Sequence, residues 1–143
     1  MSTLTTANSV ITLAVLPIFA SPRQIQGYSA DDVFSTQPIA TTEVVPGVDG
    51  RLSAGYVYNP IPWTIVLQSD SASNGFFDEW QRYQIQTRET YEAQGVVILP
   101  SIGRKYTMTR GFMTAWPPMP DAGRILRPRR YTLTWESMDA EPI

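Results

Sequence analysis

Residues that commonly carry out chemistry are sparse in this 143-residue sequence. It has no histidine and no cysteine, which excludes disulfides, thiol chemistry, zinc sites and histidine acid–base catalysis. Asp31 and Asp32 could act as paired carboxylates or bind a metal ion, but no partner for either role stands near them in the sequence. Asp78 and Glu79 could also be catalytic, although acids in the first turn of a helix are accounted for by the helix dipole.

The other chemical motifs are incomplete. The serines lack both a histidine and a G-x-S-x-G pattern, so a serine hydrolase is not supported. The segment Gly47–Gly50 lacks the Lys-Ser/Thr pair that completes a phosphate-binding loop. We therefore predict that the protein is not an enzyme and uses no metal and no cofactor.

The composition is that of a lightly charged globular protein. The chain is 43% apolar and 17% charged, and its length suits one domain spanning residues 1–143. The net charge of −2 gives no basis for binding nucleic acid through bulk charge. The apolar run at residues 10–20 is about half the ~20 residues that a membrane span needs, and no positively charged segment precedes it. We therefore expect a soluble protein.

One segment has the pattern of an amphipathic helix, from Asn74 to about residue 92. Asn74 is a good N-cap residue, and Gly95 lies just beyond the expected end. Aromatic residues recur between them at helical spacing, which predicts one face turned toward a core. This predicted core face consists of Phe76, Phe77, Trp80 and Tyr83.

The rest of the chain has the pattern of short strands separated by turns. Apolar and polar residues alternate most clearly at Tyr131–Trp135, and turns recur at a spacing of about 8–12 residues. The strongest turn is Pro46–Gly50, where Asp49-Gly50 suits a tight hairpin. We predict a mainly β fold, a barrel or sandwich of about seven or eight short antiparallel strands, with one flanking helix at residues 74–92. A flexible N-terminal arm (residues 1–9) and a short acidic C-terminal tail (residues 137–143) complete the predicted domain.

Basic residues are concentrated late in the sequence. Seven of the eleven are Arg104, Lys105, Arg110, Arg124, Arg127, Arg129 and Arg130. Arginine suits fixed, bidentate contacts with carboxylates at interfaces. Candidate acidic partners on another subunit lie in the first third of the chain, at Asp31, Asp32, Glu43 and Asp49. A phosphate-binding patch and a simple solvated surface remain open, but we favour a subunit interface because the whole chain is slightly acidic.

The aromatic content also favours an interface. Four Trp, seven Tyr and five Phe exceed what one helix packed on one sheet needs, and Tyr and Trp are enriched at interfaces. The predicted strands also leave exposed edges, which a ring of identical neighbours would pair.

Several segments follow one another in a characteristic order. An N-terminal strand pair and the Asp31-Asp32 loop precede the Asp49-Gly50 hairpin, a strand at residues 63–67 and the single helix with Phe77, Trp80 and Tyr83. The closing segments are Leu99–Tyr106, Met119–Arg124 and Tyr131–Trp135. In this order the sequence resembles the tail-tube proteins of contractile-tailed bacteriophages and related injection machines.

The resemblance implies a virion structural subunit of the main tail tube or of a baseplate ring. Six copies would form a ring around a lumen through which genomic DNA passes without specific binding, next to neighbouring tail or baseplate proteins. The protein would be located in the virion tail and assembled in the host cytoplasm. Uncharged candidates for the lumen lining are Thr41, Thr107, Thr109, Thr132 and Thr134. The stiff segments at residues 117–120 and 127–130 depart from the main-tube pattern and suit a baseplate ring.

Two other functions remain open. The first is a monomeric or dimeric adaptor of the virion that acts through the same aromatic and arginine surface. The second is a carbohydrate-binding β module that stacks sugars on Trp63, Trp80, Trp116 or Trp135. We expect core positions for Trp63, Trp80 and Trp135 instead.

Overall fold

The computed structural model describes residues 4, 8–15, 18–19, 21–28 and 33–143. Within these residues the chain forms nine strands, one α-helix and one short 3-10 turn. In chain order they are β1 (Val10–Ala14), β2 (Arg23–Ile25), β3 (Phe34–Thr36), β4 (Thr42–Pro46), β5 (Leu52–Tyr56), β6 (Ile61–Leu67), α1 (Asn74–Thr87), β7 (Ala93–Leu99), the 3-10 turn Pro100–Ile102, β8 (Arg104–Ala115) and β9 (Arg129–Pro142). No helix in this part of the chain is both long and apolar enough to cross a membrane.

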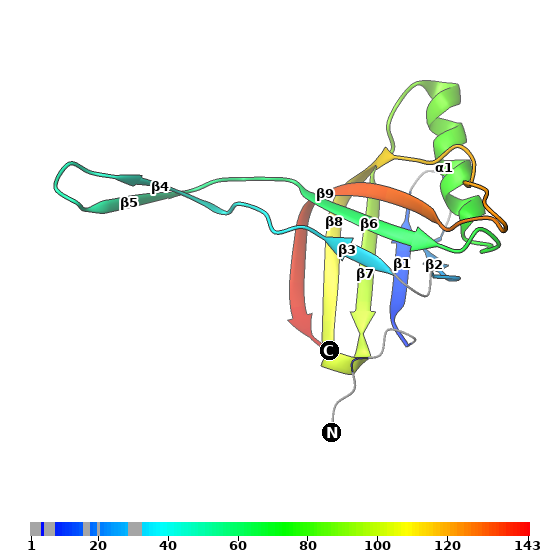
Figure 1. Ribbon diagram of the computed structural model, residues 1–143, viewed down its shortest axis with the longest axis horizontal. Helices are drawn as coiled ribbons and strands as arrows, with labels where there is room; N and C mark the ends of the chain where they lie inside the picture. The colour runs from blue at the N-terminus through cyan, green and yellow to red at the C-terminus, as the bar shows by residue number, and fades with distance from the viewer. Residues whose placement is uncertain (1–3, 5–7, 16–17, 20, 29–32) are drawn as a thin grey trace.

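Seven strands form one antiparallel sheet in the order β2-β1-β7-β8-β9-β6-β3. The sheet curls until its two sides meet at one corner, where Tyr28 forms a bridge with Leu67 and the Gln68 amide donates to the Gly27 carbonyl at 2.8 Å. The result is a partly closed barrel with α1 packed against it (Figure 1). The predicted mainly β fold with one flanking helix is confirmed.

The core lies between the curled sheet and the first turns of α1. Phe77 stacks on Tyr131 of β9 with ring centroids 4.2 Å apart, and Phe76 stacks on Phe19 at 4.7 Å. Burying one phenylalanine contributes about 1.5–3 kcal/mol relative to leaving it exposed, so these two residues fix the helix to the sheet. The same core buries the tryptophans Trp63, Trp80 and Trp135. Their expected core positions are confirmed, so none of these three provides an exposed platform for a sugar.

Helix α1 is shorter than predicted. It ends at Thr87, where Arg88 takes a left-handed conformation with φ of 57° and caps the helix, rather than at residue 92. The prediction that Tyr83 lies on the core face is wrong, because this side chain is 40% exposed. The later turns of α1 extend beyond the edge of the sheet, so they have no core to face (Figure 1).

The start of α1 also differs from the prediction. Ser73, not Asn74, is the N-cap residue. The buried Asn74 amide instead donates to the carbonyls of Gln68 and Ser69, and its oxygen accepts a bond from the Tyr131 hydroxyl at 2.9 Å. Asn74 therefore ties the loop before the helix to the sheet.

The C-terminal end of the chain is more structured than the sequence suggests. The predicted acidic tail at residues 137–143 is wrong, because β9 continues to Pro142 and pairs with β8 along this length. Met138 pairs with Met108 and packs on the core, which holds the segment in place. Most of the predicted arm at residues 1–9 lies outside the described residues, but Ser9 is buried and Ser101 donates a hydrogen bond to Asn8.

Candidate assembly interface

Strands β4 and β5 form a hairpin arm (residues 42–56) that projects away from the barrel (Figure 1). At its tip the Gly47 amide donates to the Arg51 carbonyl at 2.7 Å, and Gly50 has a φ of 85°. Asp49 accepts a bond from the Arg51 amide at 3.0 Å, which closes the turn. Glycine suits the positive φ at residue 50, so the predicted Asp49-Gly50 hairpin is confirmed.

The hairpin arm has one apolar face with no cover from its own chain. Val44 pairs with Ala54, Pro46 with Leu52 and Thr42 with Tyr56, so these side chains share a face. The opposite face carries Glu43 and Ser53 together with Val45. Every strand residue of the hairpin arm is exposed. A two-stranded hairpin is marginally stable alone in water, so this apolar face indicates contact with a partner.

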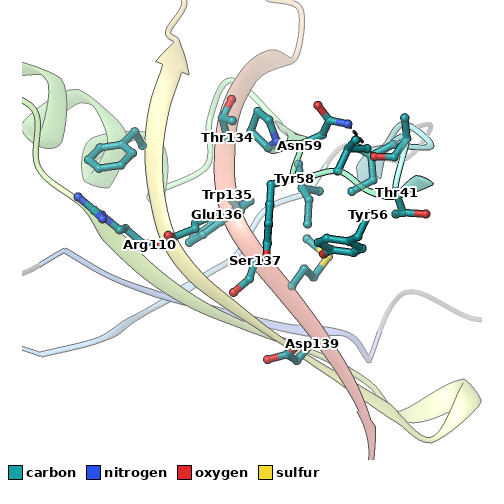
Figure 2. Close-up of a pocket in the computed structure, with 17 residues that line it drawn as sticks. Thr41, Tyr56, Tyr58, Asn59, Arg110, Thr134, Trp135, Glu136, Ser137 and Asp139 are labelled. Carbon is teal, nitrogen blue, oxygen red and sulfur yellow. Dashed lines mark hydrogen bonds between the residues drawn. The ribbon is translucent and has the colours of Figure 1, made fainter. Parts of the chain in front are cut away.

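A groove of about 710 Å³ lies where the hairpin arm joins the barrel (Figure 2). One wall is built by the segments that enter and leave the hairpin arm, including Tyr56 and Tyr58, whose rings meet edge to face at 4.7 Å. Asn59 fixes this wall by donating to the Ala40 carbonyl at 2.7 Å. The other wall is formed by residues 134–139 of β9, with Arg110 of β8 at the rim.

The distal half of β9 has an open edge along this groove. Strand β6 pairs with residues 129–135 of β9, whereas residues 137–142 pair with β8 alone among the described strands. An open edge offers unpaired backbone donors and acceptors to another strand. This edge and the hairpin arm together are the strongest candidates for contacts between subunits.

A β-bulge shapes the rim of the groove. The β7–β8 register shifts between Ala93 and Gly95, and opposite this shift Arg110 has a left-handed backbone with φ of 49°. The Arg110 guanidinium pairs with Glu92 at 3.2 Å. Gly111 lies directly under the Trp135 indole, where a Cβ would overlap the ring. The bulge therefore depends on glycine at 111 and turns Arg110 outward.

Comparisons with known proteins identify the family and the fold of this chain. Residues 2–139 match the family described as tail fiber protein gp32. The chain belongs to this family. It is thus a phage-tail-like structural protein. Among curated proteins, no sequence matches it.

The fold of this gp32-family chain recurs in contractile injection systems. It resembles a chain of the sheath/tube terminator of an extracellular contractile injection system (PVC), with a TM-score of 0.72, 12% identity, and 99% and 98% of the two chains covered. A chain of the anti-feeding prophage baseplate gives a TM-score of 0.62, 12% identity and the same coverage. A chain of the anti-feeding prophage tube-terminating cap gives 0.57, with 10% identity and 100% and 93% covered. At these identities the likeness shows the fold alone.

The structure separates the predicted basic interface of the gp32-family chain into several places. Arg104 and Lys105 begin β8, whereas Arg124 and Arg127 follow its other end, about 40 Å away for a strand of 12 residues. Lys105 forms an ion pair with Glu141 at 3.8 Å. The seven basic residues therefore do not form one face. Of the predicted acidic partners, Asp31 and Asp32 lie outside the described residues, and Asp49 lies at the tip of the hairpin arm.

Arg129 is the one predicted interface residue that the structure buries, with 6% exposure. Its guanidinium donates to both carboxylate oxygens of Asp78, at 2.9 and 3.2 Å, and to the Pro117 carbonyl at 2.7 Å. Trp116 donates to the same carboxylate at 2.9 Å. Because its Nη1 and Nη2 donors are used within its own chain and the side chain is buried, we leave Arg129 out of the proposed interface. Its neighbour Arg130 points to the opposite, exposed side of β9.

The features that sequence reasoning missed are the apolar face of the hairpin arm and the open edge of β9. The first had a signal in the apolar residues at 44, 46, 52 and 54 around a predicted turn. The open edge of β9 had no signal in the sequence, because the order of the strands in the sheet decides which edges stay unpaired. No three acidic residues gather into a metal site within the described residues.

Proposed function

We propose that this protein is a non-enzymatic subunit of a phage tail tube or baseplate ring that assembles with copies of itself around a DNA-conducting lumen. The hairpin arm carries the proposal. It exposes a continuous apolar face that includes Val44, Leu52 and Tyr56, and the barrel offers that face no cover. The tail-protein family and the fold shared with baseplate and terminator chains support the same function.

The open edge of β9 supports ring formation in particular. Residues 137–142 can accept a strand from a neighbour, and a closed ring leaves no such edge unpaired. A ring of six copies is the proposed closure, with the virion tail as location and assembly in the host cytoplasm.

The first half of β8 and the distal half of β9, which pair with each other, supply a suitable lumen lining. Thr107 pairs with Asp139 and Thr109 with Ser137, so one face carries hydroxyls and a carboxylate. Hydroxyls and negative charge would let DNA slide, because like charge prevents adhesion to the phosphates.

The test is electron microscopy and mass photometry of the concentrated protein and of a variant in which residues 42–56 are replaced by a short turn. We expect rings or tubes from the intact chain and folded monomers, with one cooperative thermal transition, from the variant. Intact chain that stays monomeric at high concentration would contradict self-assembly and favour the adaptor function.

A further inference from the structure

The connection between β8 and β9 carries a second exposed apolar surface, which we name the proline platform (residues 116–128). It lies beside α1, at the end of the molecule opposite the hairpin arm (Figure 1). Three large side chains are turned to solvent, Met119, Ile125 and Leu126, and Ile125 is 80% exposed. The barrel core gains nothing from them, so their exposure indicates contact with another molecule.

The proline platform is held in one shape. The Arg127 amide donates to the Asp121 carbonyl at 2.8 Å and the Gly123 amide to the Ile125 carbonyl at 3.0 Å, which closes a small turn. Ser69 donates its hydroxyl to the Arg127 carbonyl, which ties the turn to the loop before α1. Four prolines restrict the backbone further: Pro117, Pro118, Pro120 and Pro128. A surface that is already ordered loses little entropy on binding, which suits a docking site.

The charges of the proline platform and the hairpin arm are opposite. The platform carries two exposed arginines, Arg124 and Arg127, against the single acid Asp121. The hairpin arm carries the exposed acids Glu43 and Asp49 against the single base Arg51.

The position of Arg127 adds to this match. Its guanidinium lies over Gly123, where an added Cβ would be 3.2 Å from Nε and from Nη2. The charge is thus held at the surface of the turn.

We propose that the proline platform receives the tip of the hairpin arm of a second copy of this chain. Val48 at the tip is fully exposed and would pack on Ile125 and Leu126, with Asp49 facing the platform arginines. The inference rests on the proposed self-assembly and names the surfaces that meet. The hairpin arm and the proline platform lie at opposite ends of the molecule. The contact between two copies is therefore head to tail, and it propagates into a ring or a tube.

Cysteine cross-linking tests this directly, since the natural chain has no cysteine to interfere. We would place V48C at the tip and I125C on the platform, and treat assembled protein with a short bis-maleimide. The doubly substituted chain should give a covalent ladder, and a mixture of the two single variants should give dimers. The matched control pairs V48C with I102C, an exposed isoleucine on the 3-10 turn. We expect at least tenfold less cross-linking in the control.

Charge reversal gives an independent measurement. R124E with R127E should lower the fraction of chain in rings or tubes at least tenfold, and E43K with D49K should restore it. If wild-type protein assembles but cross-linking equals the control and the reversal has no effect, the platform does not receive the hairpin arm and the proposed function stands. If wild-type protein does not assemble, the proposed function itself fails. Cross-linking of the platform only to another tail protein would also overturn this inference.

Discussion

The pair formed by Asp78 and Arg129 makes a sharp prediction about stability. It joins α1 to the start of β9. Arg129 also donates a hydrogen bond to the carbonyl of Pro117, near the start of the proline platform. Replacing Asp78 with alanine leaves a guanidinium that is 6% exposed without its counter-ion. The variant also removes the acceptor of the Trp116 indole at 2.9 Å. The buried guanidinium would then keep its bond to the Pro117 carbonyl but lose both of its bonds to a carboxylate.

The magnitude follows from the exposure of the two partners. Breaking a fully buried pair costs about 3–5 kcal/mol, because an uncompensated charge stays in the interior. The Asp78 side chain is 45% exposed, so water can reach part of the site and the cost is smaller. We expect D78A to lower the free energy of unfolding by about 2–4 kcal/mol. R129M should cost less, about 1–2 kcal/mol, because it removes the buried charge together with an Nε that has no partner among the described residues.

The assay is urea unfolding followed by tryptophan fluorescence for D78A, R129M and the double variant. The matched control is E79A on the same helix, because Glu79 pairs with Arg82 at 3.7 Å with both side chains exposed. An exposed pair contributes about 0–1 kcal/mol, so E79A should unfold close to wild type. Repeating the series at one tenth of the protein concentration separates any contribution from assembly.

The double variant decides whether the two residues act as a pair. D78A with R129M should be less destabilised than the sum of the single variants, because the charge left behind by D78A is then absent. If D78A unfolds within 0.5 kcal/mol of E79A, or if the single effects add, the buried pair does not hold the helix to the sheet.

Two further predictions concern the core. Gly111→Ala should destabilise the protein by about 1–3 kcal/mol in urea unfolding, because its Cβ would overlap the Trp135 ring, whereas Gly75→Ala in α1 has open space and should be neutral or slightly stabilising. Burial raises the pKa of the Tyr131 phenol above its ordinary value near 10, so the unfolded chain loses this proton first as the pH rises. The free energy of unfolding should therefore be constant between pH 7 and about pH 9 and fall above pH 10, and Tyr131→Phe should make that fall shallower when urea midpoints are compared between pH 7 and 11. Burial also raises the pKa of Tyr28, which accounts for a remaining slope, and an unchanged slope in Tyr131→Phe would contradict the reasoning.

The sequence predicts this fold well where the determining contacts are local. Alternation at Tyr131–Trp135 and the Asp49-Gly50 turn depend on near neighbours in the chain, and both appear as predicted. The end of α1 does not depend on near neighbours. Tyr83 continues the aromatic spacing, but the sheet no longer reaches that turn of the helix, and only the tertiary structure contains this information.

The two adjacent arginines of β9 show the same limit within the candidate site. Strand alternation places Arg129 on the side of Tyr131 and Arg130 on the other side, so the sequence alone could have assigned Arg129 to the core. The sequence alone could not identify the counter-ion of Arg129, because Asp78 lies 51 residues away and reaches Arg129 only after the helix has packed. Counting both residues as surface charge therefore overestimated the basic interface.

The one-sided chemistry of the hairpin arm limits how a partner can bind it. Val44, Leu52 and Tyr56 share one face, while the other carries Glu43 and Ser53 beside Val45, so the first face gains more from leaving water. A partner that covered both faces would bury Glu43 at a cost, whereas one that covered the apolar face would leave this carboxylate at the rim. The partner surface therefore needs to be apolar at its centre and basic at its margin. The proline platform has this arrangement, with Ile125 between Arg124 and Arg127 in the sequence, and it lies at the end of the molecule opposite the hairpin arm (Figure 1).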